Sequence, residues 1–307
     1  MEMKIIRAGG LTTVQDLGRV GQRGAGVASG GAMDRPSLSV ANLLVGNAEN
    51  AAGLEMTLVG AEVEFDGEVW VAVMGADMGA VQRGRPLRVK AGERLKFGPA
   101  RTGARTYLAI AGGIQIETVL GGRGTDLRAG LGIFRGRPLK AGDGLPLASP
   151  ERKIGVGWWV RPTLFGEEVG SREVRILAGS ECGEFARGME DGEFRVSRRS
   201  DRMGIFLEGQ KLVRTVNREL LSSAVAPGTV QVPPEGAPIV LMADAQTIGG
   251  YPRIAHVIAV DLPILAQMRS GEAVKFRMVD LAEAHQCARR RARDFGLLRE
   301  GLWDKIR

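Results

Sequence analysis

The segment TTVQDLGRVGQRGAGVASGGAMDR, residues 12–35, combines six glycines with side chains that suit a polar ligand. Glycine accepts positive φ and lets a ligand approach the backbone closely, at a cost in conformational entropy. The side chains of interest are Gln15, Asp16, Arg19, Ser29 and Asp34. Arginine can hold a carboxylate through two parallel hydrogen bonds, and exposed backbone N–H groups can cradle an anion. The segment predicts either a binding surface on a rigid scaffold or a plain surface loop.

Three later segments show the same mixture of polar side chains and glycines: GGRGTDLRAG, VSRRSDRMGIFLEG and QVPPEGAPIVLMADAQTIGGYPRIAHV. Their candidate residues are Arg123 and Thr125, then Ser200, Asp201 and Arg202, then Gln231, Asp244, Gln246, Thr247, Gly249, Gly250 and Tyr251. Asp and Ser beside glycine are also ordinary turn residues, and neighbouring Asp and Arg often form structural pairs. For each segment, a ligand site and a structural turn both stay open.

The opening segment would form one wall of a ligand site if a cleft lies between the two halves of the chain. Across this cleft we expect Gln15, Asp16 and Arg19 to face Asp244, Gln246 and Thr247. An arginine–carboxylate contact is stronger in such a water-poor site than on the surface. The alternative is that Asp16 and Arg19 pair with each other and only hold the loop shut.

Short strands separated by glycines make up most of the chain, at residues 61–65, 69–75, 87–98, 105–113, 172–179 and 238–244. One helix is expected over residues 34–47, where Asp34 can cap, Pro36 suits the first turn and Gly46 can end it. Another begins near residue 280 and carries arginines on a water-facing side. The pattern predicts a mainly β protein, a barrel or a sandwich, with few short helices.

An internal repeat indicates a duplication. Ser29 lies 45 residues before Met74, and Ser197 lies 45 residues before Met242. Each half then ends in a similar motif, GERLKF and GEAVKF. We expect a duplicated β-unit of roughly 100 residues. The predicted domains are residues 1–155, residues 156–285 and a basic helical tail at residues 286–307.

Composition narrows the classes of function. With 307 residues, 44% hydrophobic residues and neither an apolar run nor a signal segment, the chain is expected to be cytoplasmic and not bound to a membrane. The net charge of +7 comes without a nucleic-acid motif, so it favours an anionic substrate or an acidic partner. Cys182, Cys287, His256 and His285 have no metal or nucleophile spacing, and no metal site is predicted. Phosphate-loop, HExxH and GxSxG motifs are absent.

Five stretches carry a resemblance to a known family: LTTVQDLGRVGQRGAGVASGGAMD, ANLLVGN, YLAIAGGI, SDRMGIFLEG and QVPPEGAPIVLMADAQTIGGYPRIAHVIAVDL. Over about residues 3–285, the chain resembles the allophanate hydrolase subunit 2 family, also called biotin-dependent carboxyltransferase-like. The resemblance implies two cyclophilin-like β-barrel units. The chain departs from the family at Gly122–Thr125, where two serines are lost, and at Arg198 and Arg199.

The resemblance implies a subunit of an ATP-dependent 5-oxoprolinase, which opens the lactam of 5-oxoproline to glutamate. Its partners would be a subunit 1-like protein of the kinase-inhibitor type and a third subunit, and a homo-oligomer is a further option. ATP, with Mg²⁺ as an option, would be the cofactor. Asp16, Asp244, Gln246 and Thr247 would be catalytic, and the other candidate residues would bind substrate or nucleotide.

Two other activities within this family stay open. One is a regulatory protein that antagonises a kinase inhibitor. The other is a carboxyltransferase subunit of a urea amidolyase-like enzyme, for which biotin would be the cofactor. No biotin-attachment motif occurs in the chain, so it would act on carboxybiotin that is made elsewhere.

Overall fold

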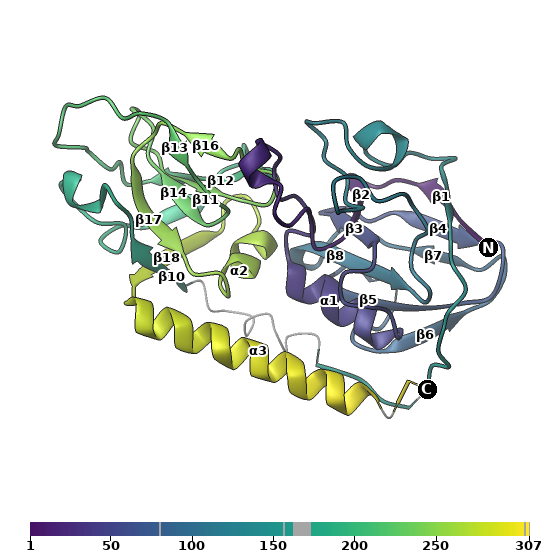
Figure 1. The fold of residues 1–307 in the computed structure, drawn as a ribbon. Coiled ribbons are helices and arrows are strands. Elements are labelled where there is room, and N and C mark those ends of the chain that lie inside the picture. Colours follow the sequence, from purple (N-terminus) through teal and green to yellow (C-terminus); the bar gives the residue numbers. More distant parts are fainter. Residues whose placement is uncertain (80, 156, 162–172, 304, 307) are drawn as a thin grey trace. The chain divides into compact units, whose positions relative to one another are not determined.

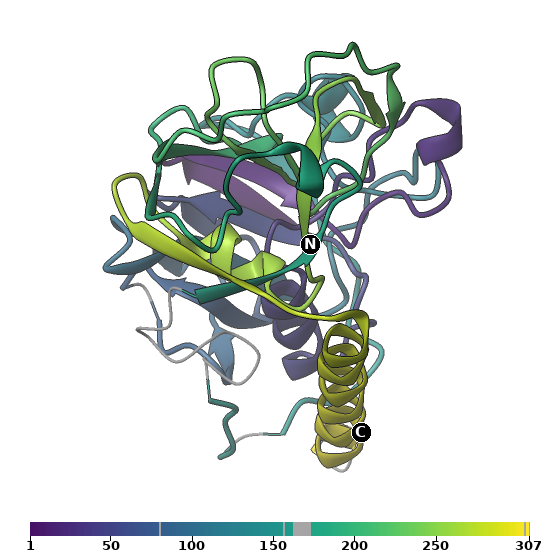
Figure 2. The ribbon, with the colours of Figure 1, turned by 90° about the vertical axis from the view of Figure 1, so that its left-hand side faces the viewer.

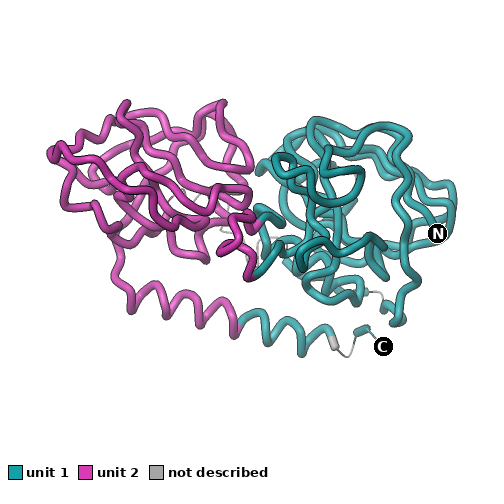
Figure 3. The backbone as a smooth tube through the Cα atoms, turned by 45° about the horizontal axis from the view of Figure 1, so that its top comes forward, with its two compact units in different colours: residues 1–20, 30–168, 294–307 teal, residues 21–29, 169–293 magenta. Residues whose placement is uncertain are grey.

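The computed structural model describes residues 1–79, 81–155, 157–161, 173–303 and 305–306 (Figure 1). The chain divides into two compact units (Figure 3). Unit 1 contains residues 1–20, 30–168 and 294–307, and unit 2 contains residues 21–29 and 169–293. The middle of the opening glycine-rich segment therefore belongs to unit 2, whereas both of its ends belong to unit 1.

Unit 1 contains two antiparallel sheets. The first has the strand order β7-β4-β1-β9. Its strands are β1 (Glu2–Arg7), β4 (Glu62–Phe65), β7 (Arg94–Lys96) and β9 (Gly144–Pro146). The second has the order β2-β3-β8-β5-β6. Its strands are β2 (Leu11–Gln15), β3 (Gly53–Thr57), β5 (Val69–Asp77), β6 (Pro86–Val89) and β8 (Thr102–Ile110).

A single apolar core joins these two sheets. Ile5 and Val63 of the first sheet are completely buried in the same cluster as Leu54 and Val71 of the second. The alternation of buried and partly exposed residues along β4 is the period of two that a half-buried strand requires. Burying each such aliphatic side chain stabilises the fold by about 1.5–3 kcal/mol.

Helix α1 (Arg35–Leu44) lies on the five-stranded sheet of unit 1 (Figure 1). Its apolar residues Val40 and Leu44 pack with Ala72 and Met74 of β5. The Asp34 carboxylate caps its first turn by accepting hydrogen bonds from the Ser37 N–H at 3.0 Å and the Ser37 hydroxyl at 2.7 Å. The helix predicted over residues 34–47 is confirmed, with its cap.

Unit 2 is a closed barrel with the strand order β10-β17-β14-β15-β12-β11-β18. The strands are β10 (Glu173–Ala178), β11 (Phe194–Val196), β12 (Gly204–Gly209), β14 (Thr229–Gln231), β15 (Ile239–Leu241), β17 (Arg253–Val257) and β18 (Ala273–Met278). The β10–β18 pair is parallel and closes the barrel, which leaves no unpaired strand edge within this set of strands. Together the two units confirm the mainly β prediction.

Shorter elements complete the fold. A two-stranded ribbon pairs β13 (Ser223–Ala224) with β16 (Ile248–Gly249). The short 3-10 helices are η1 (Arg23–Ala25), η2 (Ile133–Gly136) and η3 (Cys182–Glu184), and α2 (Leu262–Gln267) is a short α-helix.

Helix α3 (Leu281–Trp303) is a continuous helix of 23 residues (Figure 2). It is longer than the short helices expected from the sequence, because good helix formers such as Ala, Glu, Leu and Arg fill it. Among the described residues, no helix combines the length and the apolar character that a membrane span requires.

The loop after β10 is fixed to β17 by an ion pair in unit 2. Both Glu181 carboxylate oxygens accept hydrogen bonds from the Arg253 side chain, each at 3.0 Å. The Arg253 backbone N–H donates to the same carboxylate at 2.9 Å. Chiefly through the side-chain hydrogen bonds, Arg253 lowers the pKa of Glu181 from 4.5 to about 2.

This pKa predicts a pH-dependent contribution to stability. Because the folded pKa is lowered, the contribution is complete above pH 4.5 and disappears as the pH falls towards 2. The shift corresponds to about 3 kcal/mol. Glu181→Gln should lower the free energy of unfolding by up to that amount at pH 7, and the difference from wild type should vanish near pH 2.

Urea denaturation of both proteins across this pH range checks the prediction. Glu193→Gln makes the same charge change on a side chain that is 84% exposed, and should shift stability by less than about 1 kcal/mol. A Glu181→Gln effect that does not change with pH would contradict the proposed origin.

Candidate functional site

The candidate residues of unit 1 meet where β2 ends. Gln15 is the last residue of β2, and its side-chain amide donates hydrogen bonds to the Thr13 hydroxyl at 3.1 Å and to the Thr125 carbonyl at 3.0 Å. The Thr125 N–H donates to the Val14 carbonyl at 2.8 Å. The segment at residues 122–126 therefore lies directly against the end of β2.

Asp16 and Arg19 both bind backbone groups and not each other. The Asp16 carboxylate accepts hydrogen bonds from the Gly18 N–H at 2.8 Å and the Arg123 N–H at 2.6 Å. The Arg19 guanidinium, which is completely buried, donates to the carbonyls of Val119 at 3.2 Å and Gly124 at 2.7 Å. No ion pair joins Asp16 to Arg19 among the described residues.

Three buried polar atoms in this cluster have no hydrogen-bond partner within the described chain: Gln15 Oε1, Arg19 Nη1 and Thr125 Oγ1. A buried polar atom of this kind costs about 1–3 kcal/mol. The sequence predicted all three residues as site residues. We define Gln15, Asp16, Arg19 and Thr125 as the unit 1 cluster.

A glycine is required where the two segments meet. A Cβ atom at Gly124 would lie 2.7 Å from Gln15 Oε1 and 2.9 Å from Asp16 Oδ1. A larger residue here would displace the Gln15 amide and the Asp16 carboxylate from their present positions. The neighbouring Arg123 points elsewhere, since its Nε donates to the Ile116 carbonyl at 3.3 Å.

A buried hydrogen-bond network that the sequence did not predict holds residues 33 and 34, at the end of the opening glycine-rich segment. The Tyr107 hydroxyl donates to Glu55 Oε2 at 2.7 Å and accepts from the Asp34 N–H at 2.8 Å. Glu55 Oε2 also accepts from the Met33 N–H at 2.8 Å. Burial, and then the charge of Glu55, raise the pKa of Tyr107 well above 10, so the phenol stays a hydrogen-bond donor. Asp34 itself caps α1. The only sequence signal is a glutamate within a run of buried strand residues.

In unit 2, a chain of amides joins the predicted residues of the fourth segment. The Gln246 side chain donates to Gln231 Oε1 at 3.3 Å, and Gln231 Nε2 donates to the Tyr251 carbonyl at 3.3 Å. A Cβ atom at Gly249 would lie 2.7 Å from Gln231 Nε2, so the glycine makes room for this amide. Gly250 packs near Ser222, and the Thr247 carbonyl accepts from the Val225 N–H at 3.0 Å.

Arg23 brings the opening segment into this part of unit 2. Its guanidinium donates to the carbonyls of Val225 and Gln246, and to the Ser29 hydroxyl at 3.4 Å. Burial lowers the pKa of Arg23. Sequence reasoning missed Arg23, because an arginine in a glycine-rich loop gives no signal of its own. We define Arg23, Gln231 and Gln246 as the unit 2 cluster.

Ser200 and Asp201 hold the turn between β11 and β12. The Ser200 hydroxyl accepts from the Phe206 N–H at 3.1 Å and donates to the Phe206 carbonyl at 3.3 Å. Asp201 Oδ1 accepts from the N–H groups of Met203 and Gly204 at 2.8 and 3.2 Å. Both side chains thus have structural partners in this turn.

Arg202 and Asp244 form a bidentate ion pair in which both side chains are 4% exposed. Arg202 Nε lies 2.7 Å from Asp244 Oδ2, and Nη2 lies 2.9 Å from Oδ1. Removing one member of a buried pair leaves an uncompensated charge.

Metal ligands and cysteine thiols were the remaining candidates for chemistry among the described residues. No group of three or more His, Cys, Asp or Glu side chains that suits a metal occurs among them. Burial, together with the charge of Glu190, raises the pKa of Cys182, so its thiol stays protonated near neutral pH. The cleft in which the unit 1 cluster would face Asp244, Gln246 and Thr247 stays a prediction.

The Arg202–Asp244 pair generates a stability prediction. Asp244→Asn should lower the free energy of unfolding by about 3–5 kcal/mol, because Arg202 then keeps a buried charge without its counter-ion. The double variant Arg202→Met/Asp244→Leu removes both charges and should recover much of the loss. Urea denaturation measures both changes. Wild-type stability in Asp244→Asn, with turnover of an assembled enzyme abolished, would assign the aspartate to catalysis instead.

Comparisons with known proteins agree with the resemblance seen in the sequence. The family model described as carboxyltransferase domain, subdomain A and B, matches residues 25–278. The chain is 47% identical over 292 residues to a 5-oxoprolinase subunit of Escherichia coli (strain K12), covering 92% of this chain and 93% of that protein. It is 40% identical to the protein of the same name from Haemophilus influenzae, covering 91% of both.

The fold of the chain is also similar to that of a solved structure. The crystal structure of the K. lactis urea amidolyase superposes with a TM-score of 0.89 at 23% identity, over 100% of this chain and 21% of that one. At this identity the match bears on the fold alone. From the family model and the two full-length relatives, the chain belongs to the carboxyltransferase domain family, subdomain A and B.

Proposed function

We propose that the chain is a subunit of an ATP-dependent 5-oxoprolinase, which hydrolyses the lactam of 5-oxoproline to glutamate together with a subunit 1-like partner and a third subunit. The proposal is carried by the 47% identity to the E. coli 5-oxoprolinase subunit over nearly the whole of both proteins. The unit 1 cluster supplies the chemistry that such a substrate needs.

A lactam presents one N–H donor and one carbonyl acceptor side by side. The unit 1 cluster contains donor and acceptor atoms that complement these groups and have no partner in the described chain. Gln15 Oε1 can accept the ring N–H. Thr125 Oγ1 and Arg19 Nη1 can donate to the carbonyl oxygen, on which negative charge develops as water attacks. These are the three atoms of the unit 1 cluster that are buried without a partner in the described chain.

Asp16 is the carboxylate that suits the role of base. Each of its oxygens accepts one backbone N–H, which fixes the group and leaves lone pairs for a water molecule. Asp244 is bonded through both oxygens to Arg202. Asp16 would take a proton from water as its oxygen attacks the lactam carbon. Asp16 would then pass this proton to the ring nitrogen as the C–N bond breaks, so that the nitrogen leaves as the amine of glutamate.

The two clusters do not fit the phosphates of ATP. The guanidinium of Arg23 is bonded to carbonyls, and Arg19 keeps only one nitrogen without a partner among the described residues. Outside the clusters, the candidate Arg202 is bonded to Asp244. ATP, on which the proposed reaction depends, is therefore not assigned to either cluster.

The hydroxyl of Thr125 separates a catalytic role from a structural one. Thr125→Val removes a buried hydroxyl that has no partner in the described chain, so stability should not fall. Turnover of the assembled complex should fall about 100- to 1,000-fold, the usual loss when one oxyanion donor is removed. Steady-state release of glutamate from 5-oxoproline measures turnover, and urea denaturation measures stability.

Thr12→Val is the matched control, on the strand β2 against which the Thr125 segment lies. The Thr12 hydroxyl donates to the Ala8 carbonyl at 2.6 Å, so its loss should lower stability by about 0.5–1.5 kcal/mol and leave turnover unchanged. Normal turnover in Thr125→Val would remove the unit 1 cluster from the mechanism.

Partnership is tested by reconstitution. The purified chain should not cleave 5-oxoproline with ATP, whereas the chain mixed with its two partner subunits should. Activity of the chain unaided would contradict the proposed division of labour. Equal turnover by the two partner subunits without this chain would contradict the assignment of the chain to the enzyme.

A carboxyltransferase role is the second candidate. The matched family model is named for that activity, and the fold agrees with the K. lactis urea amidolyase. Transfer of carboxylate from free carboxybiotin to urea by the chain, without 5-oxoprolinase turnover in the reconstituted complex, would favour it.

A further inference from the structure

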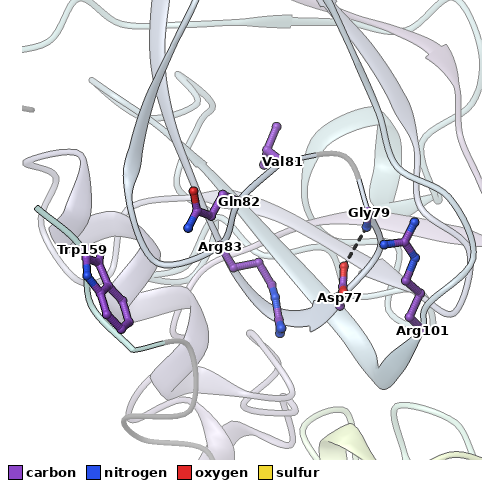
Figure 4. Close-up of a pocket in the computed structure, with 7 residues that line it drawn as sticks. All are labelled: Asp77, Gly79, Val81, Gln82, Arg83, Arg101 and Trp159. Carbon is purple, nitrogen blue, oxygen red and sulfur yellow. Dashed lines mark hydrogen bonds between the residues drawn. The ribbon is translucent and has the colours of Figure 1, made fainter. Parts of the chain in front are cut away.

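A polar pocket lies in unit 1, apart from the residues of both clusters. It has a volume of about 510 Å³ and forms at the end of β5 and the loop that follows. Its walls include Asp77, Gly79, Gln82, Arg83, Arg101 and Trp159 (Figure 4). Ligand sites commonly have volumes of about 300–1,000 Å³, so the space suits a small organic molecule.

The two arginines of this pocket have no carboxylate partner among the described residues. The Arg83 guanidinium is anchored through one nitrogen, which donates to the Gly75 carbonyl. The Arg101 guanidinium lies against Gly79, where a Cβ atom would be 3.1 Å from its Nη2. Gly79 has a φ of +76°, which only glycine adopts readily, so the turn leaves room for the arginine.

The charge balance of the pocket favours an anion. Asp77 is the single carboxylate of the described lining, and its Oδ1 accepts the Gly79 N–H at 2.9 Å. Two guanidinium groups thus face one carboxylate. The arginines of the two clusters are engaged by protein oxygens, whereas most donors of Arg83 and Arg101 have no partner in the described part of the chain. Guanidinium groups bind carboxylates and phosphates through parallel hydrogen bonds.

An aromatic ring lies on the other side of Arg83 from Asp77 (Figure 4). The Trp159 indole is 58% exposed, an unusual state for the largest apolar side chain. An exposed indole offers a flat face on which a planar ring can stack. The nearby Gln82 amide, which can both donate and accept, suits the polar edge of such a ring.

We propose that this pocket binds an anion attached to a flat ring, with Arg83 and Arg101 holding the anionic group and Trp159 stacking on the ring. Nucleoside phosphates and aromatic carboxylates share this chemistry. The inference goes beyond the proposed function and does not depend on it, because it rests on unit 1 side chains that the lactam chemistry does not use.

In the sequence repeat, the segment of this pocket that contains Asp77 corresponds to the segment of unit 2 that contains Asp244. Asp77 lies three residues after Met74, and Asp244 lies two residues after Met242, the two methionines that the repeat pairs. In unit 2 the aspartate is neutralised by the buried Arg202. In unit 1, by contrast, no ion pair of the described residues joins Asp77 to Arg83 or Arg101, so these arginines stay open to a ligand.

Isothermal titration calorimetry on the full chain tests the proposal with two probes, ADP and indole-3-acetate. At least one should bind saturably at low salt. Its Kd should rise tenfold or more in Arg101→Ala and in Trp159→Ala. The probe that binds identifies the anionic group as phosphate or carboxylate. Adenosine, which has the ring without the anion, should bind at least tenfold more weakly than ADP if ADP is the ligand.

Arg88→Ala is the matched control, because it removes an arginine that is 60% exposed on β6 of the same unit. It should leave the Kd unchanged, and thermal unfolding should confirm that all three variants fold. Absence of binding by both probes, or a Kd that is the same in Arg101→Ala and Trp159→Ala as in wild type, would overturn the proposal. The titration measures heat of binding to the chain alone, so failure of the 5-oxoprolinase assay would not affect its outcome.

Discussion

The Asp16 residue is the point at which three segments of unit 1 are held together. Its carboxylate binds the Gly18 N–H just after β2 and the Arg123 N–H of the later glycine-rich segment. Its backbone carbonyl accepts the Ala32 N–H at 2.8 Å. Between Gly18 and Ala32 the chain leaves unit 1, contributes residues 21–29 to unit 2, and returns. One residue therefore anchors both ends of that excursion, and Arg23 fixes its middle through two carbonyls.

The arginines of the candidate site and those of the Trp159 pocket form two groups that the charge count does not separate. Those of the two clusters donate hydrogen bonds to backbone carbonyls, and Arg202 pairs with a buried carboxylate, so they fix loops. Those of the Trp159 pocket lie on a solvent-accessible wall and keep donors available. The net charge of +7 alone therefore does not show which guanidinium groups can bind a ligand. The hydrogen-bond partners of each group decide this.

Local patterns in the sequence predicted the elements of the fold well. Strand β5 begins at Val69 as predicted and continues to Asp77, and β15 lies within the predicted residues 238–244, because β-branched runs between turn residues specify strands. Asp34 and Pro36 specify the start of α1. The predicted residues Gln15, Asp16, Arg19 and Thr125 do come together, although Thr125 is about a hundred residues from the other three in the chain. What the sequence did not predict depends on long-range contacts: Glu55 and Tyr107 bond across neighbouring strands, and the partners of Arg23 lie some two hundred residues away.

Unit 1 combines regular local structure with buried polar atoms that lack a partner among the described residues, which occur in the unit 1 cluster and also at Arg85 Nε and Trp158 Nε1. In unit 1, β4 alternates between buried and partly exposed residues and α1 has a capped first turn. Local sequence preference and the overall fold therefore agree in these elements. Beside this consistency, three neighbouring side chains each leave one buried polar atom without a partner in the described chain. Apolar replacements at these atoms would remove the cost, because burying a hydroxyl or an amide oxygen without a hydrogen bond destabilises the native state. A sequence that keeps the three unpartnered atoms of the unit 1 cluster side by side has lower stability at that position. Such a local loss of stability is expected where ligand binding, and not folding, determines which residues are present.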